Sequence, residues 1–216
     1  MLGLELSTKK KLNILCLGAH CDDIEIGCGG TLIKILETYQ VDSVMWVVFS
    51  SNEIRMKEAQ LSSENFLSNI ENKTIKIESY RDGFLQASFV ELKEYFEQIK
   101  SSYNPDLIFT HYRNDLHQDH RLVSELTWNT YRNHLILEYE IPKYDGDFAT
   151  PNFYVSLDKD IVKRKIEVIL NSFKSQALKH WFDEETFKAL LKLRGLESLS
   201  KHAEAFYVRK VSFLNN

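Results

Sequence analysis

The stretch GAHCDDIEIGCGGT, from Gly18 to Thr31, decides the fold that we expect for this chain. It comes directly after an apolar run, Leu12 to Leu17, and the whole segment LNILCLGA from Leu12 to Ala19 is typical of a strand buried on both faces. It leads into Thr31 to Gln40, where apolar residues recur at helical spacing. A strand that passes through a polar, glycine-rich turn into a helix is the usual place for a site in an open α/β sheet.

Strand-like and helix-like segments alternate through the first half of the chain. The further strands that we expect are Ser43 to Ser50, Thr74 to Tyr80 and Asp106 to Thr110, and the helices are Glu53 to Ile70 and Phe89 to Ile99. An Asp-Gly turn signal separates the strand at Thr74 from the helix at Phe89. This alternation predicts an α/β fold, a Rossmann-like three-layer αβα sandwich with a mostly parallel sheet.

The second half of the chain has a looser pattern. We expect helices at His117 to Trp128, Asp158 to Phe173 and Phe182 to Leu199, the last with a break at Gly195, and strands at Leu135 to Pro142, Asn152 to Leu157 and Ala205 to Phe213. The chain has no evident linker. We therefore expect a single domain over residues 1–216, with a parallel βαβ half at about 12–130 and a C-terminal part at about 131–216.

Composition excludes several classes of protein. With 44% hydrophobic and 27% charged residues the chain has the composition of an ordinary globular protein. A net charge of −4 gives no basic footprint, so we expect no nucleic-acid partner. We expect no integral membrane segment, since the apolar runs are too short. The chain has three cysteines and no CxxC pair, which favours reduced thiols. In MLGLELSTKKKLN the lysines follow a short apolar piece, the wrong order for a signal peptide, so we expect a cytoplasmic protein.

Two polar clusters each follow a predicted strand. His20, Asp22 and Asp23 follow the first strand, and HQDH at His117 to His120 follows the strand that begins at Asp106. Because parallel strands end at the same edge of a sheet, we expect the two clusters to meet. Two histidines and one carboxylate leave coordination positions open, which is typical of catalytic Zn²⁺ or Fe²⁺.

Other interpretations of these residues remain open. Asp22 and Asp23 could cap a helix, and Cys21 could itself be a metal ligand or a nucleophile. A non-catalytic or nucleotide-binding Rossmann-type domain would use the glycine cluster against a phosphate. The spacing disfavours that alternative, because an acidic loop separates Gly18 from Gly27 and no GxGxxG follows the first strand.

AHCDDIEIGCGGT resembles the AHPDDxxxGxGGT signature of the PIG-L (LmbE-like) family of zinc-dependent N-acetyl-sugar deacetylases, and NDLHQDHR resembles that family's HxDH signature. Further matches are Arg55 and Glu58 in EIRMKEA, Asp82-Gly83, and AEAF at Ala203 to Phe206. The resemblance covers about residues 12 to 210. It implies a metal-dependent amidase that acts on linear C–N bonds and hydrolyses the N-acetyl group of an amino sugar or N-acetylglucosamine conjugate.

The resemblance also implies a role for each site residue. His20, Asp23 and His120 would be the zinc ligands, Asp22 the general base, His117 the acid and oxyanion stabiliser, Asp119 a carboxylate that orients an imidazole, and Arg55 and Asp82 contacts to sugar hydroxyls. The alternatives are a solvated helix charge for Arg55 and a simple turn for Asp82. The residues around 131–154 would shape the sugar pocket, and the family implies a trimer or hexamer.

Two positions depart from the family pattern. Cys21 stands where most members have proline, which places a thiol close to the expected metal. His202 stands where many members have tyrosine before AEAF. The resemblance would make His202 a substrate-binding hydrogen-bond donor, and the alternative is a surface histidine.

Overall fold

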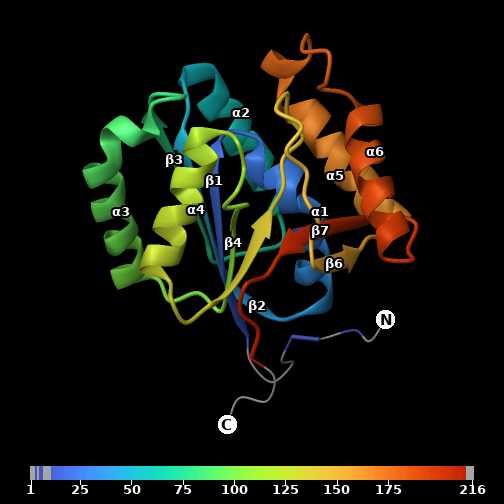
Figure 1. Cartoon of the computed structure of the whole chain (residues 1–216), viewed down its shortest axis with the longest axis horizontal. Helices are drawn as coiled ribbons and strands as arrows, with labels where there is room; N and C mark the ends of the chain where they lie inside the picture. Colours follow the sequence, from blue (N-terminus) through green and yellow to red (C-terminus); the bar gives the residue numbers. More distant parts are fainter. Residues whose placement is uncertain (1–2, 4, 7–10, 213–216) are drawn as a thin grey trace.

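Seven strands form one twisted sheet in the computed structural model, which describes residues 3, 5–6 and 11–212 (Figure 1). The strands are β1 (Leu12–His20), β2 (Val41–Ser50), β3 (Lys73–Tyr80), β4 (Leu107–His111), β5 (Leu135–Tyr139), β6 (Phe153–Ser156) and β7 (Ala203–Tyr207). The helices are α1 (Asp23–Thr38), α2 (Glu53–Phe66), α3 (Phe89–Ser102), α4 (Gln118–Thr130), α5 (Lys159–Ser172) and α6 (Glu184–Glu197), with short 3₁₀ turns η1 (Leu85–Ser88) and η2 (Lys174–Gln176).

The sheet is mostly parallel, in the order β3-β2-β1-β4-β5-β7-β6. Strand β1 pairs in parallel with β2 and with β4, and β4 pairs in parallel with β5. Strand β7 is antiparallel to both of its neighbours, β5 and β6. The carboxyl ends of β1, β2 and β4 therefore meet at one edge, as the sequence predicts for a doubly wound sheet.

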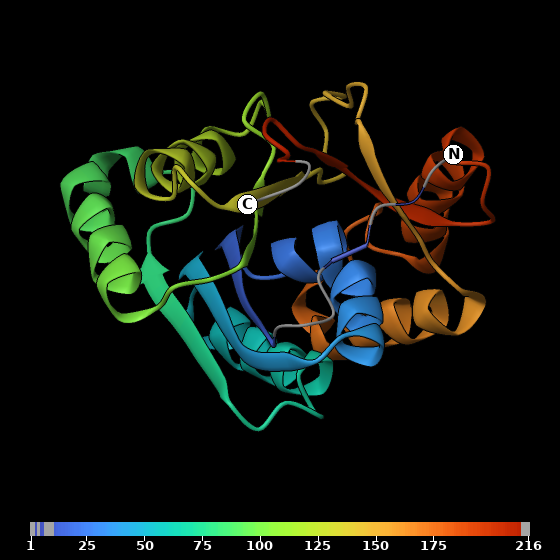
Figure 2. The ribbon, with the colours of Figure 1, turned by 90° about the horizontal axis from the view of Figure 1, so that it is seen from below.

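Helices cover both faces of the sheet. Helices α3 and α4 lie on one face, and α1, α2, α5 and α6 lie on the other (Figures 1 and 2). Residues along β1 alternate between the two apolar cores, since Ile14 and Cys16 face the core with α1 and α5 whereas Leu15 and Leu17 face α3 and α4. The predicted three-layer αβα class is confirmed.

Helix α1 begins at Asp23, well before the predicted start at Thr31. Its first half contains three glycines, which have low intrinsic helix propensity. Close packing explains them: a Cβ on Gly27 would lie 2.1 Å from the Tyr139 ring, and one on Gly29 would lie 2.8 Å from the Phe66 ring. The glycine cluster thus lets α1 pack tightly behind the loop at His20.

Several predicted boundaries need correction. The predicted break at Gly195 is wrong, because α6 continues through it to Glu197. A Cβ on Gly195 would lie 2.7 Å from the carbonyl oxygen of Lys201, so this glycine allows two segments to approach closely. Strand β5 ends at Tyr139, three residues before the predicted Pro142. Strand β7 begins two residues early, at Ala203, and the predicted end at Phe213 lies outside the described residues.

Candidate active site

The two polar clusters lie side by side at the edge where β1 and β4 end. A hydrogen bond from backbone to side chain ties the strand ends together, since the N–H of Ala19 donates to Nε2 of His111 at 2.9 Å. His20 is the last residue of β1, and α4 begins with His117 as its N-cap and carries His120 in its first turn.

His20, Asp23 and His120 bring two ring nitrogens and a carboxylate together. Nδ1 of His20 lies 3.1 Å from Nε2 of His120 and 3.5 Å from Oδ2 of Asp23, and Nε2 of His120 lies 3.6 Å from Oδ1 of Asp23. Ligands about 2.0–2.2 Å from a tetrahedral zinc ion are themselves about 3.3–3.6 Å apart. The three side chains therefore fit a small divalent cation.

The outward nitrogens of both imidazoles contact carboxylates, which sets their tautomers. Nε2 of His20 lies 3.2 Å from Oδ2 of Asp119 and 3.1 Å from Oδ1 of Asp82. Nδ1 of His120 lies 3.0 Å from Oδ2 of Asp115. Carboxylates accept, so we assign the protons to these nitrogens. When both imidazoles are neutral, as coordination requires, the lone pairs on Nδ1 of His20 and Nε2 of His120 face one another across the position that a metal would take.

Neighbouring side chains offer overlapping sets of donors. Among the residues that the structure describes, three groups have potential ligand atoms within 4.8 Å of one another: His20 with His117 and His120, Asp23 with His111 and His120, and His20 with Asp82 and Asp119. Burial and the nearby His111 lower the pKa of His120 to about 4, so its imidazole is neutral at neutral pH, as a metal ligand must be.

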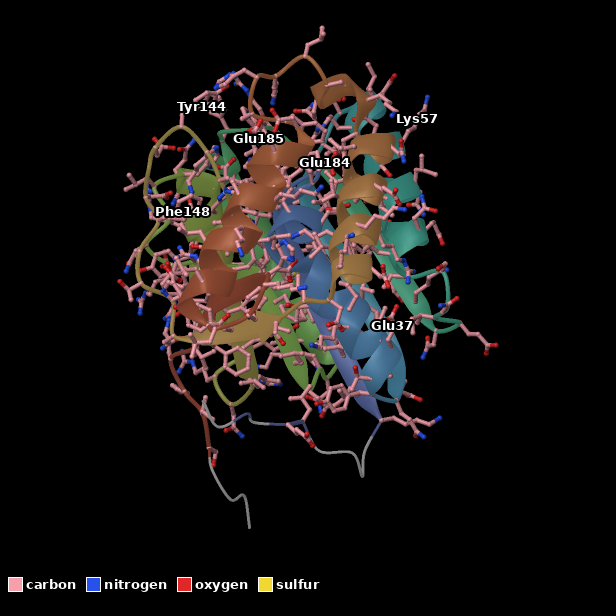
Figure 3. The ribbon with its side chains drawn as sticks, turned by 90° about the vertical axis from the view of Figure 1, so that its right-hand side faces the viewer. Glu37, Lys57, Tyr144, Phe148, Glu184 and Glu185 are labelled. Carbon is pink, nitrogen blue, oxygen red and sulfur yellow. The ribbon has the colours of Figure 1, made fainter. Side chains whose placement is uncertain are left out.

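A cavity of about 620 Å³ opens over these residues. Its inner wall contains His20, Asp22, Asp23, Arg55, Asp82, His117 and His120. Its outer wall comes from the segments after β5 and after η2, including Tyr144, Lys179 and Trp181. Tyr144 lies on an exposed loop (Figure 3), and its ring is 5.6 Å from that of His180. The cavity is large enough for a sugar-sized ligand.

Asp22 is the N-cap residue of α1, but its side chain makes no capping hydrogen bond. Its backbone adopts φ 94°, a left-handed conformation that is strained for a residue with a Cβ. The carboxylate faces the cavity, where Oδ2 lies 3.0 Å from Nη2 of Arg55. Burial raises the pKa of Asp22 to about 6, Arg55 opposes that rise, and Asp23 adds to it. A carboxyl with this pKa suits a general base near neutral pH.

Arg55 is not a solvated helix charge. Its guanidinium also donates to the carbonyl oxygen of Cys21 and lies 5.2 Å from the centre of the Phe173 ring. Arg55 therefore holds both the side chain of Asp22 and the backbone of the loop before it.

His117 points one ring nitrogen at its own helix and the other away from it. Nδ1 accepts the N–H of Asp119 at 3.2 Å, so a neutral His117 carries its proton on Nε2. Burial lowers the pKa of His117, and the charge on His20 lowers it further. Neutral His117 is thus suited to donate a hydrogen bond into the cavity.

Asp119 and Asp82 contact the same imidazole from different environments. Asp119 is fully buried, and its carboxylate accepts the N–H groups of Gly83 at 2.7 Å and Leu85 at 3.2 Å. This ties the Asp-Gly turn to α4. Asp82 is 78% exposed, and its hydrogen bond to His20 lowers its pKa. Asp82 is therefore more than a turn residue, because its carboxylate reaches the site.

Sequence reasoning missed His111 and Asp115. His111 is fully buried, lies 3.2 Å from Oδ2 of Asp23, and stacks on the ring of His120 with centroids 3.9 Å apart. The position of His111, directly after the predicted strand end at Thr110, could have indicated that it lies at the site. Asp115 carried a weaker signal, since a lone carboxylate two residues before His117 resembles an ordinary loop residue.

The remaining two predicted positions lie apart from the metal-ligand atoms. The thiol of Cys21 is buried and lies 3.6 Å from the carbonyl oxygen of Ser50. Burial raises its pKa to about 12, so it is a poor nucleophile, and Cys21 belongs to none of the groups of potential ligand atoms found among the described residues. His202 lines a separate surface depression beside α6, with Glu184 and Lys188. The structure does not bring His202 together with the other site residues.

The glycine cluster is not available to a phosphate. The backbone N–H groups of Gly30 and Thr31 donate to the two oxygens of Glu204, at 2.8 and 2.6 Å. Nζ of Lys165 donates to Glu204 at 2.6 Å and to the carbonyl oxygen of Ile26 at 2.7 Å. A buried carboxylate thus already occupies these donors, which argues against the nucleotide-binding alternative.

The family profile of PIG-L, described as GlcNAc-PI de-N-acetylase, matches residues 15–131, which contain both polar clusters. The chain belongs to the PIG-L family. Membership places it among enzymes that hydrolyse linear amide C–N bonds. Within the described part of this PIG-L protein, no helix is both long and apolar enough to cross a membrane.

Solved structures with the same fold are distant in sequence. A conserved protein from Thermus thermophilus is 21% identical with a TM-score of 0.72, over 94% of this chain and 97% of that one. The N,N'-diacetylchitobiose deacetylase from Pyrococcus horikoshii is 20% identical with a TM-score of 0.68, over 93% and 85%. The 4-carboxy-2-hydroxymuconate hydratase GalB from Pseudomonas putida is 14% identical with a TM-score of 0.71, over 95% and 99%. The PIG-L fold therefore also occurs in a hydratase, so the site must identify the reaction.

Proposed function

We propose that this PIG-L protein removes the N-acetyl group of an amino sugar or an N-acetylglucosamine conjugate and releases acetate and a free amine. The observation that carries the proposal is the convergence of donor atoms from His20, Asp23 and His120, 3.1–3.6 Å apart, beside an Asp22 carboxyl that caps nothing. The family description and the chitobiose deacetylase with the same fold support an N-acetyl sugar as substrate.

We propose Zn²⁺ as the metal, with Fe²⁺ as the alternative, held by His20, Asp23 and His120. When bound, the metal would supply a Lewis acid for the amide carbonyl and would lower the pKa of a water molecule. Asp119 and Asp115 would hold the imidazoles of His20 and His120 in the orientation that coordination needs.

The protein's own side chains perform the proton transfers in this scheme. The carboxylate of Asp22 accepts a proton from the attacking water, and Arg55 keeps that carboxylate ionised and in place. Nε2–H of His117 donates to the carbonyl oxygen as negative charge builds on it. Asp22, once protonated, delivers its proton to the leaving nitrogen. We assign protonation of the amine to Asp22 in preference to His117, because burial keeps His117 neutral.

Substrate contacts, localisation and assembly complete the proposal. Arg55 and Asp82 line the cavity and are proposed to contact sugar hydroxyls, whereas His202 is left out because it lines another depression. The three cysteines are free thiols, which supports a cytoplasmic location.

We propose that the whole chain acts as one domain. Sedimentation of the purified protein tests for the trimer or hexamer implied by the family.

Acetate release from a panel of N-acetylglucosamine conjugates tests the reaction. We expect release by the zinc-loaded protein, loss after chelation and recovery after Zn²⁺ is restored. Release that survives both complete metal removal and Asp22→Ala would contradict the scheme. Lys163→Met is the matched control, since Lys163 is an exposed residue of α5 that does not line the cavity.

A further inference from the structure

Asp115 lies in the connection between β4 and α4, and its carboxylate contacts both histidines of the second cluster. Oδ1 accepts the backbone N–H of His117 at 2.8 Å, and Oδ2 lies 3.0 Å from Nδ1 of His120. The residue is only 1% exposed. A single carboxylate therefore sets both the backbone position of His117 and the ring orientation of His120.

Lys143 approaches the same carboxylate from a different part of the chain. It follows β5 in the segment that forms the outer wall of the cavity. Its Nζ lies 2.8 Å from Oδ2 of Asp115, 2.7 Å from Oδ2 of Asp147 and 3.2 Å from the carbonyl oxygen of Ile141. The ammonium thus compensates a buried carboxylate that would otherwise be costly to ionise.

The rest of the Asp115 environment limits where this carboxylate can move. Nη1 of Arg121 donates to the carbonyl oxygens of Asp115 and Leu116, at 2.9 and 2.6 Å, which anchors the backbone. The N–H of Leu116 donates to Asp147 at 2.7 Å, so the same loop of the cavity wall is held at a second point. The contact is therefore a built junction between the cavity wall and α4.

We propose that Asp115 and Lys143 are a positioning pair, in which Asp115 holds His120 ready to bind metal and Lys143 links that readiness to the position of the cavity wall. The pair acts through His120 and His117, and neither member touches the reacting atoms. The inference rests on the proposed function only in taking His120 as a metal ligand. Beyond the proposed function, it predicts that the metal affinity depends on Lys143, a residue that lines the substrate cavity.

Competition between the metal-free protein and a chromophoric chelator for Zn²⁺ tests the pair without any substrate. Asp115→Asn should weaken zinc affinity by about 10–100-fold, the usual cost of losing a carboxylate behind a ligating histidine. Lys143→Met should weaken it by about three- to tenfold, less than Asp115→Asn because Lys143 acts through Asp115, and Lys143→Arg should recover most of the loss. Asp145→Asn, in the same exposed loop, and Lys163→Met, which pairs only with Glu167 at 3.7 Å among the interactions described, are matched controls that should change nothing.

Steady-state kinetics separates positioning from direct substrate contact, because Lys143 also lines the cavity. At saturating Zn²⁺ the positioning role predicts a lower kcat for Lys143→Met with an unchanged KM. Unchanged zinc affinity with a raised KM would overturn the proposal and make Lys143 a substrate contact. Unchanged zinc affinity in a folded Asp115→Asn protein would overturn it as well. If Asp115→Asn fails to fold, the Lys143→Met and Lys143→Arg comparison decides.

The two proposals fail in different ways. If the wild type binds Zn²⁺ and the variants lose affinity as expected, but no conjugate yields acetate, the positioning pair stands and the proposed reaction falls. If acetate is released but the zinc affinity does not change in the Asp115 and Lys143 variants, the proposed reaction stands and the positioning pair is contradicted.

Discussion

Nη2 of Arg55 lies 3.0 Å from Oδ2 of Asp22, so an arginine from α2 holds the carboxylate at the start of α1. Asp22 is buried, and burial alone would drive its pKa upwards. The guanidinium opposes that effect and keeps a useful fraction of the carboxylate ionised. This pairing makes the pH dependence of the reaction sensitive to a residue of a neighbouring helix.

Arg55→Met should move the acidic limb of kcat/KM to higher pH. A general base works only when ionised, so activity falls as pH drops through the pKa of Asp22, which is about 6. Removing a cation that lowers this pKa raises it, and the loss of activity then begins at higher pH. The pH–rate profile measures this shift. Arg55→Lys, which keeps the charge, should shift the limb less, and an unmoved limb in Arg55→Met would contradict the assignment.

Asp22 and Asp23 are adjacent but should respond differently to loss of charge. Asp22→Asn should retain stoichiometric zinc and lose about 10²–10⁴-fold in kcat, because it removes the base and leaves the ligands. Asp23→Asn should lose zinc itself, since Asp23 contributes a carboxylate to the donor set. Metal analysis of the two purified variants beside their kinetics checks both expectations. Equal zinc loss in both would mean that Asp22 is also a ligand.

Much of the fold was predictable because most strands of the parallel half are short apolar runs followed by a helical pattern. The early start of α1 could not be predicted. Gly27 and Gly29 of this helix pack against the rings of Tyr139 and Phe66, which come from distant parts of the chain. The insertion of β7 between β5 and β6 depends on tertiary pairing that no local periodicity encodes.

The position of the candidate site could be predicted from the strand ends. The residues that support its side chains could not. His20, Asp23 and His120 lie where parallel strands predict them, although their roles stay predictions. His111 and Asp115 act through contacts to those residues, and a lone histidine or aspartate has no sequence pattern that announces such a contact. His202 shows the opposite error, since a match by sequence position placed it in a site that it does not line.

Cys21→Ala should leave zinc content unchanged and kcat within about threefold of wild type, because a thiol with a pKa near 12 is not ionised at neutral pH. The thiol contacts a backbone oxygen of Ser50, which is not a ligand atom. Alkylation by iodoacetamide should be slow in the folded protein and fast for all three thiols in denaturant. Rapid inactivation of the folded wild type, prevented in Cys21→Ala, would show a reactive thiol at the site.

Glu204→Gln should destabilise the fold by about 3–5 kcal/mol, the usual cost of removing one partner from a buried ion pair. Both Glu204 and Lys165 have side chains only 3% exposed. Lys165→Met should have a similar cost, and the double variant should lose clearly less than the sum, because the two residues share one network. Urea unfolding of the four proteins gives the coupling free energy. Additive losses would mean that the two side chains act independently.

The bond from Glu204 to Gly30 and Thr31 joins positions about 170 residues apart in the chain, close to its two ends. These two N–H groups of α1 gain the Glu204 carboxylate as an acceptor only once β7 has been made and has docked. Contacts of such long range form late, because the intervening chain must first be ordered. During synthesis on the ribosome, the helix behind the loop at His20 therefore lacks this contact until β7 has been made. A chain shortened before residue 204 would lose more than β7, since it would also leave the buried Lys165 ammonium without this carboxylate.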